Sequence, residues 1–352
     1  MGDIYPKVRL AAVQASPIFL NREATAEEAC ALILEAGKNG ADFVAFPENF
    51  IPGHPVWPVY NIGGQSEKSM RFAAEFYKNS VEIPSETVDK ICQAASRAGV
   101  YVVMGMSEKK PNQTGTTFNT QLFIDRAGKI IGKHQKLHPT MTEMLVQTGG
   151  SGKYVGTVQT EFGPVSGLIC GENSNPFAVG VLASEYTRIH CSAWPSHFMI
   201  GPGRYPMYQS IEIASRNIAY MCKSFVVGSA GTVNDEMLDM LCTSNEEREF
   251  FKDPKVTGGS IIVDPTGSII AGPMDGDKEG ILYADVDLEK CVFNHYVHDF
   301  GGYYNRPDVF RLFVNDTEDE LVTRVPSAGA FSRPEKNFGV FKDLGCDNGD
   351  EE

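Results

Sequence analysis

The stretch "TAEEACALILEAGKNGADFVAFPE", residues 25–48, indicates the fold class because its periodicity changes from helical to strand-like within a few residues. Apolar residues at helical spacing follow Thr25, which we predict as the helix N-cap, and Gly40 ends the pattern. The apolar run 42–48 then predicts a buried strand that stops at Glu48. A helix that leads directly into a buried strand is typical of α/β proteins.

The same alternation continues outward from this stretch, and three hairpins interrupt it, over 118–137, 155–170 and 258–273. Other expected strands are 8–15, 99–108, 187–194, 223–232 and 280–288, and other expected helices lie near 66–80, 85–98 and 206–221. The turns 125–128 (DRAG) and 264–267 (DPTG) each separate two apolar strands. Hairpins among parallel units predict mixed sheets covered by helices, and the repeated turn hints at two similar halves.

No linker rich in proline, glycine or serine divides the chain, which therefore predicts one large domain. We interpret the segments 50–66 and 234–257 as insertions near a site or an interface. Beyond about residue 290 the periodicity fades, and the acidic end "DLGCDNGDEE", 343–352, predicts a solvated, disordered tail.

Composition narrows the class of partner and the compartment. The 352 residues carry a formal net charge of −14, which disfavours nucleic acid and anionic membrane surfaces as partners. No apolar run approaches the length of a membrane span, and the first residues lack a basic region followed by a long apolar segment, so we predict no signal peptide. The eight cysteines have irregular spacings without a CxxC pair, so we expect free thiols and a cytoplasmic location.

Cys170 ends an apolar strand in "GLICGENSNP", residues 167–176. Most free cysteines are inert packing residues, but Ser174 as a cap and Pro176 predict a helix that begins just after this thiol. Unpaired amides at a helix N-terminus would favour a thiolate and stabilise an oxyanion, and Gly171 would let the backbone approach a substrate. Cys170 is therefore a candidate nucleophile.

Two charged residues also follow strands. Glu48 is either a surface turn carboxylate or a general base at the end of its strand, where ligands of α/β sheets bind. Lys136 is either a basic residue at a strand edge or part of the same site. His134 and His138 lack the glutamate of an HExxH motif, so no metal is predicted. No GxGxxG or phosphate loop is present, so no cofactor is expected either.

Three segments together resemble the motifs of the nitrilase superfamily of carbon–nitrogen hydrolases. They are "FPENFIPGHP" (46–55), "GKHQKLHPTMTE" (132–143) and "LICGENSNP" (168–176), in this order and spacing. The resemblance implies Glu48 as general base, Lys136 as cationic stabiliser, Cys170 as nucleophile and Glu143 as supporting carboxylate. It also implies a four-layer α-β-β-α sandwich without cofactor or metal, and homodimers that assemble into larger oligomers.

The motif "RPDVF", 306–310, is similar to the nitrilase branch of the superfamily. The resemblance implies a carbon–nitrogen hydrolase domain over 1–315 and a C-terminal extension over 316–352. It implies hydrolysis of a small-molecule nitrile to the acid and ammonia through a cysteine thioimidate and thioester. An amidase or ureidase with a carbonyl substrate, and a catalytically silent assembly protein, are the alternatives.

Candidate substrate-binding residues lie beside these motifs. Many nitrilases have tryptophan after the nucleophile, so Gly171 is expected to reshape the pocket floor. The candidates for the pocket wall are Trp57, Trp194, Pro195 and His197. Core packing explains the two tryptophans equally well.

Overall fold

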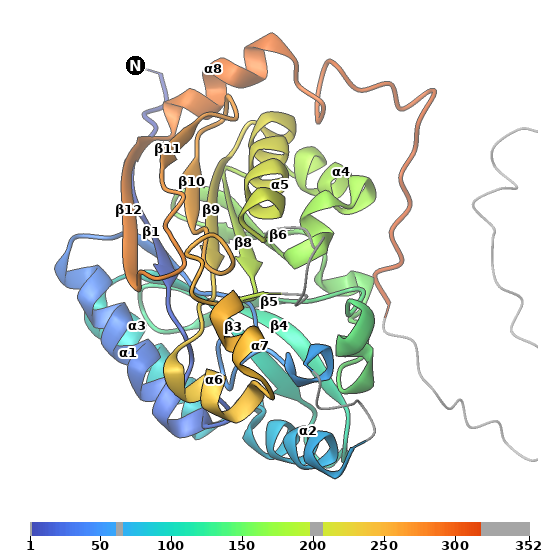
Figure 1. Cartoon of the computed structure of the whole chain (residues 1–352). Coiled ribbons are helices and arrows are strands. Elements are labelled where there is room, and N and C mark those ends of the chain that lie inside the picture. Colours follow the sequence, from blue (N-terminus) through green and yellow to red (C-terminus); the bar gives the residue numbers. More distant parts are fainter. Residues whose placement is uncertain (1, 61–65, 198–206, 318–352) are drawn as a thin grey trace, which may run out of the picture. The chain divides into compact units, whose positions relative to one another are not determined.

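The computed structural model describes residues 2–60, 66–197 and 207–317, and the strands of this part form two six-stranded sheets (Figure 1). The first sheet has the strand order β12-β1-β2-β3-β4-β5. Its strands are β1 (Lys7–Gln14), β2 (Phe43–Ala45), β3 (Tyr101–Lys109), β4 (Thr117–Ile124), β5 (Ile130–Gln135) and β12 (Gly280–Asp287).

The second sheet has the order β11-β10-β9-β8-β7-β6. Its strands are β6 (Thr157–Thr160), β7 (Gly163–Ile169), β8 (Ile189–Trp194), β9 (Phe225–Ala230), β10 (Ile261–Val263) and β11 (Ile269–Ala271). In each sheet three neighbouring strands are parallel, and the strands that flank them are antiparallel. The turns that the sequence repeats connect β4 to β5 and β10 to β11, so they occupy equivalent places in the two sheets.

Helices cover the outer face of each sheet. The first sheet packs against α1 (Arg22–Lys38) and α3 (Glu86–Ala98), and the second packs against α4 (Pro176–Ser184) and α5 (Met207–Cys222). The alternation within β1 shows how the layers form, since Ala11 and Val13 face the helices while Leu10 and Ala12 face the other sheet. The predicted α-β-β-α sandwich with two mixed sheets is confirmed.

The structure corrects one local expectation and adds helices in two other segments. The first helix begins earlier than expected, because Asn21 is its N-cap and the Thr25 hydroxyl donates to the Asn21 and Ile18 carbonyls instead. The segment 234–257, which we interpreted as an insertion, contains α6 (Asp235–Leu241) and α7 (Asn245–Phe250). The side chains of Asn234 and Ser244 cap these helices. A further helix, α8 (Glu289–Val297), follows β12 where the periodicity fades.

The remaining elements complete the description of the chain. Helix α2 spans Glu67–Asn79, and the short 3₁₀ helices are η1 (Trp57–Val59), η2 (Met141–Leu145), η3 (Gly152–Tyr154) and η4 (Cys170–Ser174). In the described part of the chain, no helix is both long and apolar enough to cross a membrane. The predicted acidic tail lies outside the described residues, and the domain boundary near residue 315 stays a prediction.

Candidate active site

The three candidate residues from the sequence follow three different strands and face one another where these strands end. Glu48 comes three residues after β2, Lys136 directly follows β5, and Cys170 directly follows β7. The Glu48 amide donates to the Trp194 carbonyl at 3.2 Å, which links the end of β2 in the first sheet to the end of β8 in the second. The carboxyl ends of parallel strands thus bring residues from both sheets to one place.

Lys136 forms the centre of a buried charge cluster. Its Nζ donates to Glu48 Oε1 at 2.7 Å and to Glu143 Oε2 and Oε1 at 2.7 and 3.0 Å. Burial alone would lower the pKa of Lys136, but the charges of Glu48 and Glu143 and the neighbouring Cys170 raise it above its ordinary value. Lys136 is therefore a fixed cation that both carboxylates hold.

The Glu48 carboxylate has two unequal oxygens. Oε1 accepts from Lys136 and, at 2.6 Å, from Asn119 Nδ2, whereas Oε2 is buried without a hydrogen-bond partner among the described residues. Gly105 on β3 allows this arrangement, because a Cβ at that position would collide with the Pro47 carbonyl oxygen. One oxygen is thus positioned by the protein, and the other is available to accept a proton.

Glu143 lies in the short helix η2, where its carboxylate has two roles. Oε2 accepts from the Thr140 amide at 2.8 Å, forming the capping box of this helix, and also accepts from Lys136. Burial alone would raise the pKa of Glu143, but the hydrogen bond from His54 and the charge of Lys136 lower it. Glu143 is therefore ionised at neutral pH and holds Lys136 in place.

His54 is a member of this cluster that the sequence analysis missed. Its Nε2 lies 3.0 Å from Glu143 Oε1 and 3.6 Å from Glu48 Oε1, and the side chain is only 7% exposed. Burial alone would lower the pKa of His54, but the hydrogen bonds and charges of Glu143 and Glu48 raise it to about 9. His54 lies within the motif "IPGHP", but its partner Glu143 is 89 positions away in the sequence. No local pattern therefore indicates that the two residues interact.

Cys170 occupies a strained turn at the end of β7. Its φ of 54° is in the left-handed region, which non-glycine residues rarely adopt, and it begins the helix η4. The N-cap of α4 is Asn175 rather than the predicted Ser174, so Cys170 does not sit directly at the N-terminus of that helix. Burial and the Glu48 charge raise the pKa of Cys170 well above its ordinary value, so the resting side chain is a thiol whose proton a base must remove.

Glu172, two residues after Cys170, connects the cysteine turn to the lysine segment. Its carboxylate accepts from the Leu137 amide at 2.6 Å and from the Ile169 amide at 3.1 Å. These two amides are the neighbours of Lys136 and Cys170 in the chain. His134 Nε2 lies 2.9 Å from the same carboxylate, and this buried pair lowers the pKa of Glu172 against the effect of burial. Because Glu172 holds the residues next to Lys136 and Cys170, it fixes the distance between the lysine ammonium and the cysteine thiol.

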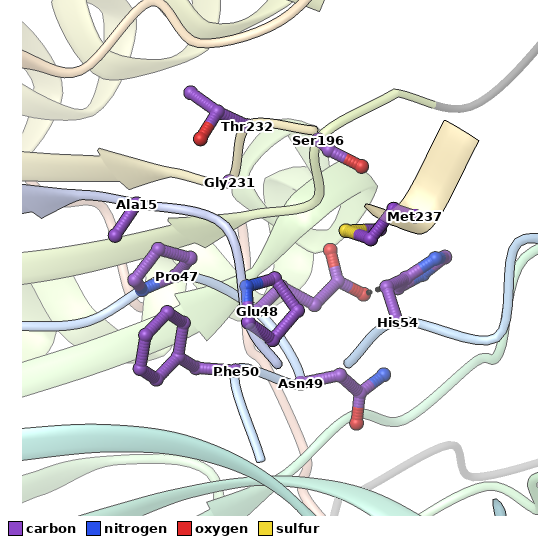
Figure 2. Close-up of a pocket in the computed structure, with 11 residues that line it drawn as sticks. Ala15, Pro47, Glu48, Asn49, Phe50, His54, Ser196, Gly231, Thr232 and Met237 are labelled. Atoms are coloured by element: carbon purple, nitrogen blue, oxygen red, sulfur yellow. Dashed lines mark ion pairs between the residues drawn. The ribbon is translucent and has the colours of Figure 1, made fainter. Parts of the chain in front are cut away.

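The cavity beside Glu48 has a mostly apolar wall. Figure 2 shows the Glu48 carboxylate pointing toward His54, with Met237 close to both. The lining residues are Ala15, Pro17, Pro47, Glu48, Asn49, Phe50, His54, Ser196, Gly231, Thr232 and Met237. The cavity therefore combines the general-base candidate with a small number of polar groups.

None of the predicted wall residues lines this cavity among the described residues. Trp57 packs on Phe76 with ring centroids 5.6 Å apart, and Trp194 is buried and donates from Nε1 to Ser192 Oγ at 3.0 Å. His197 Nε2 and the Tyr60 hydroxyl oxygen form a hydrogen bond of 3.1 Å. Pro195 directly precedes the cavity residue Ser196 in the sequence. Their contact with substrate stays a prediction.

Gly171 is exposed, and a Cβ added there would meet open space. Its amide donates a hydrogen bond toward the Cys170 sulfur, which lowers the pKa of that thiol against the larger effect of burial. The amide is thus in place to stabilise negative charge on the sulfur or on an atom bonded to it.

One group of the described residues has the composition of a metal site. Glu48, His54 and Glu143 offer ligand atoms within 4.8 Å of one another. However, the Lys136 ammonium already bonds to both carboxylates, and its positive charge would repel a metal dication beside it. The donor set therefore fits a lysine better than a metal ion.

The α-β-β-α architecture is shared with solved structures of the nitrilase superfamily. The chain belongs to the carbon–nitrogen hydrolase family, whose sequence pattern matches residues 9–294. The structure resembles that of Nit3 from Saccharomyces cerevisiae, a member of branch 10 of the nitrilase superfamily. The two chains are 24% identical with a TM-score of 0.61, over 83% of this chain and 94% of the other.

Two sequence relatives span nearly the whole chain. A nitrilase from Bacillus sp. (strain OxB-1) is 36% identical over 326 residues, which are 91% of this chain and 92% of the relative. A cyanide hydratase from Aspergillus niger is 32% identical over 336 residues, which are 92% of this chain and 91% of the relative. Both names describe enzymes that act on a carbon–nitrogen triple bond.

Proposed function

We propose that this chain is a nitrilase that converts an organic nitrile and two water molecules to the carboxylic acid and ammonia. The observation that carries the proposal is the position of Lys136 Nζ, bonded to Glu48 and Glu143 and interacting electrostatically with Cys170. A base, a cation and a thiol within one buried cluster are what nucleophilic addition to a nitrile needs. The 36% identity to a nitrilase over most of both chains supports the substrate class.

In the first half of the reaction, Glu48 acts as general base. Its unpartnered Oε2 takes the thiol proton while the Cys170 sulfur bonds to the nitrile carbon, and the nitrogen takes up a proton to give a thioimidate. Because the Cys170 pKa is raised, the thiol keeps its proton until the base removes it. Lys136 and the Gly171 amide stabilise the negative charge that develops.

In the second half, water cleaves the covalent intermediate. Glu48 takes a proton from the first water, whose oxygen bonds to the thioimidate carbon, and ammonia leaves with a proton to give a thioester. A second water attacks the thioester carbon, and the Cys170 thiol leaves with a proton as the acid forms. Glu143 contacts neither reacting atom in this scheme, and holds the Lys136 ammonium toward them.

Hydration to an amide is a second candidate, and the similarity to a cyanide hydratase favours it. If the thiol leaves the tetrahedral intermediate before ammonia does, the product is the amide, and only one water is consumed. The same residues serve both outcomes. Which group leaves first decides between them, so the ratio of acid to amide is the measurement that separates the two functions.

The test is a substrate panel with the full chain. An arylacetonitrile, an aliphatic dinitrile, cyanide and an amide are supplied separately, and ammonia, acid and amide are quantified. We expect ammonia and acid from at least one nitrile; ammonia from the amide alone would instead identify an amidase. Cys170→Ala is expected to abolish turnover and keep the fold, while Cys30→Ala on α1, distant from the site, is the matched control. Full activity of Cys170→Ala would refute the mechanism.

We further propose a homodimer that assembles into larger oligomers. Large apolar side chains are exposed on α4, α5 and α8 and on the segment after α8: Phe177, Ile213, Tyr220, Phe293, Tyr296, Val297, Phe310 and Phe313. A second copy of the chain would bury this surface. Light scattering of the purified chain tests this, and a monomer at micromolar concentration would refute it.

We also propose that residues 1–315 form the hydrolase domain, with 316–352 as a C-terminal extension, and that the protein is cytoplasmic. The match of the family pattern to residues 9–294 supports the domain, and the free state of the described cysteines supports a reducing compartment. Deletion of 318–352 is expected to leave a folded chain, as a thermal melt would show.

A further inference from the structure

His54 has one ring nitrogen in use and one that is free. Nε2 bonds to Glu143 Oε1 at 3.0 Å, and Nδ1 is buried without a hydrogen-bond partner among the described residues. A buried polar atom that lacks a partner costs on the order of 1–3 kcal/mol, so such atoms commonly have a functional role. His54 also lines the cavity beside Glu48 (Figure 2).

The other polar side chains of the cavity wall have partners. Asn49 pairs with Gln147, Ser196 with His197, and Thr232 donates to Glu279 at 2.8 Å. The exceptions are Glu48 Oε2, which the proposed mechanism uses as the base, and His54 Nδ1. An apolar wall with one unassigned polar atom is the arrangement that fixes the orientation of a small ligand.

The charges around His54 decide whether Nδ1 is a donor or an acceptor. Glu48 and Glu143 face its Nε2, Lys136 bonds to the same two carboxylates, and Cys170 interacts with these groups electrostatically. With Lys136 and a protonated His54, two positive charges balance two negative ones. A neutral His54 would leave a net charge of −1 in a buried cluster, which is costly. At neutral pH both ring nitrogens therefore carry protons, and Nδ1 is a donor.

We propose that His54 is a specificity-determining residue whose Nδ1–H donates a hydrogen bond to an acceptor atom of the substrate near the reacting carbon. The favoured substrates are then nitriles with an ether, hydroxyl or second nitrile group close to the one that reacts. This inference rests on the proposed nitrilase function and deepens it. The aliphatic part of such a substrate contacts the apolar wall that Phe50 and Met237 contribute.

The test uses substrate pairs that differ by one acceptor atom. Methoxyacetonitrile is compared with butyronitrile, and 3-methoxypropionitrile with pentanenitrile, so an ether oxygen replaces a methylene at two positions. The measured quantity is the ratio of kcat/KM within each pair. The unaltered chain is expected to favour the ether in at least one pair, by about 10-fold for a hydrogen bond from a charged donor.

Two variants separate the two nitrogens of the ring. His54→Gln places an amide donor near the position of Nε2 and lacks a counterpart of Nδ1, whereas His54→Asn does the reverse. Both are expected to lower turnover. Only His54→Gln is expected to lose the preference for the ether, while His54→Asn keeps the ratio and slows both substrates together.

A pH series on the unaltered chain gives the same information without a substitution. As the pH rises through about 9, His54 loses the Nδ1 proton, because Nε2–H remains bonded to Glu143, and Nδ1 becomes an acceptor. The preference for the ether is expected to disappear over this range. Other ionisations affect both substrates of a pair alike and cancel in the ratio.

The outcomes distinguish this inference from the function on which it rests. An ether preference that is absent in the unaltered chain, or unchanged in an active His54→Gln and across the pH series, would overturn the role of His54 and leave the nitrilase function standing. Failure of every nitrile to react would overturn the nitrilase function, and the role of His54 with it.

Discussion

Replacement of Lys136 by methionine tests the charge cluster directly. Methionine has nearly the length of lysine, so the change removes the ammonium with little change in volume. Two buried carboxylates, Glu48 and Glu143, would then face only His54 as a positive partner, and the cluster would carry a net charge of −1. Breaking a buried ion pair by removing one partner destabilises a protein by about 3–5 kcal/mol.

The double variant Lys136→Met/Glu143→Gln should recover part of this loss. It removes one charge of each sign, so Glu48 and His54 remain as a balanced pair. If the losses of the single variants Lys136→Met and Glu143→Gln simply added, they would give one value for the free energy of unfolding of the double variant. We expect the measured value to exceed it by about 1–3 kcal/mol, as is found for residues in direct contact. Activity is not expected to return, because loss of a preorganised charge-stabilising group costs about 10²–10³-fold in kcat.

Urea unfolding monitored by tryptophan fluorescence measures stability, and ammonia release measures kcat. Lys78→Met is the matched control, because it removes the lysine of an exposed pair with Glu75 and should change stability by at most about 1 kcal/mol. Two outcomes would refute the idea that Lys136 balances the charges of Glu48 and Glu143. One is that the stability losses of Lys136→Met and Glu143→Gln are additive, and the other is that Lys136→Met is as stable as the unaltered chain.

Three further perturbations have expected outcomes. Gly105→Ala would push the Pro47 carbonyl and with it Glu48, so we expect about 1–3 kcal/mol of destabilisation and a lower kcat. Gly180→Ala on α4, where the new Cβ would meet only Leu312 at an ordinary 3.5 Å, should leave kcat unchanged. Glu172→Gln replaces one of the two acceptor oxygens by an amide group, and thermal melts should show about 1–3 kcal/mol less stability. We expect kcat to fall more than KM rises, and an unchanged kcat would contradict the positioning role of Glu172. The folded-state pKa of His54 is about 9 against 6.5 unfolded, so its stabilisation is complete below pH 6.5 and is lost as pH rises to about 9. Unfolding free energies should fall by on the order of 3 kcal/mol across that window, and the fall should be absent in His54→Gln.

The mixed sheets covered by helices could be predicted because they depend on patterns that are local in sequence, whereas the four-layer sandwich was implied by the resemblance of the three motifs. Apolar alternation placed most strands, and the motifs placed Glu48, Lys136 and Cys170 after them. The helices α6 and α7 were missed because they are short and polar, although Asn234 and Ser244 are typical N-caps that could have indicated them.

The finer features of the site could not be predicted because they depend on contacts between distant residues. The Cys170 pKa depends on burial and on Glu48, which is supplied by the other sheet, so the residues near Cys170 in the sequence do not show its direction. His54 was overlooked for the same reason, since nothing near it in sequence marks it as ionised. Burial of Trp57 and Trp194 could not be separated from pocket contact before the packing was known.

The pairing of β1 with β12 has a consequence for synthesis on the ribosome. Lys7 pairs with Asp287, so the first strand made receives its outer neighbour only after most of the chain has been translated. At about 5–20 residues per second, that edge stays open for roughly 15–60 s. During this time the nascent chain exposes an apolar strand to other polypeptides, so ribosome-associated chaperones should increase the yield of active protein more than they increase its final stability.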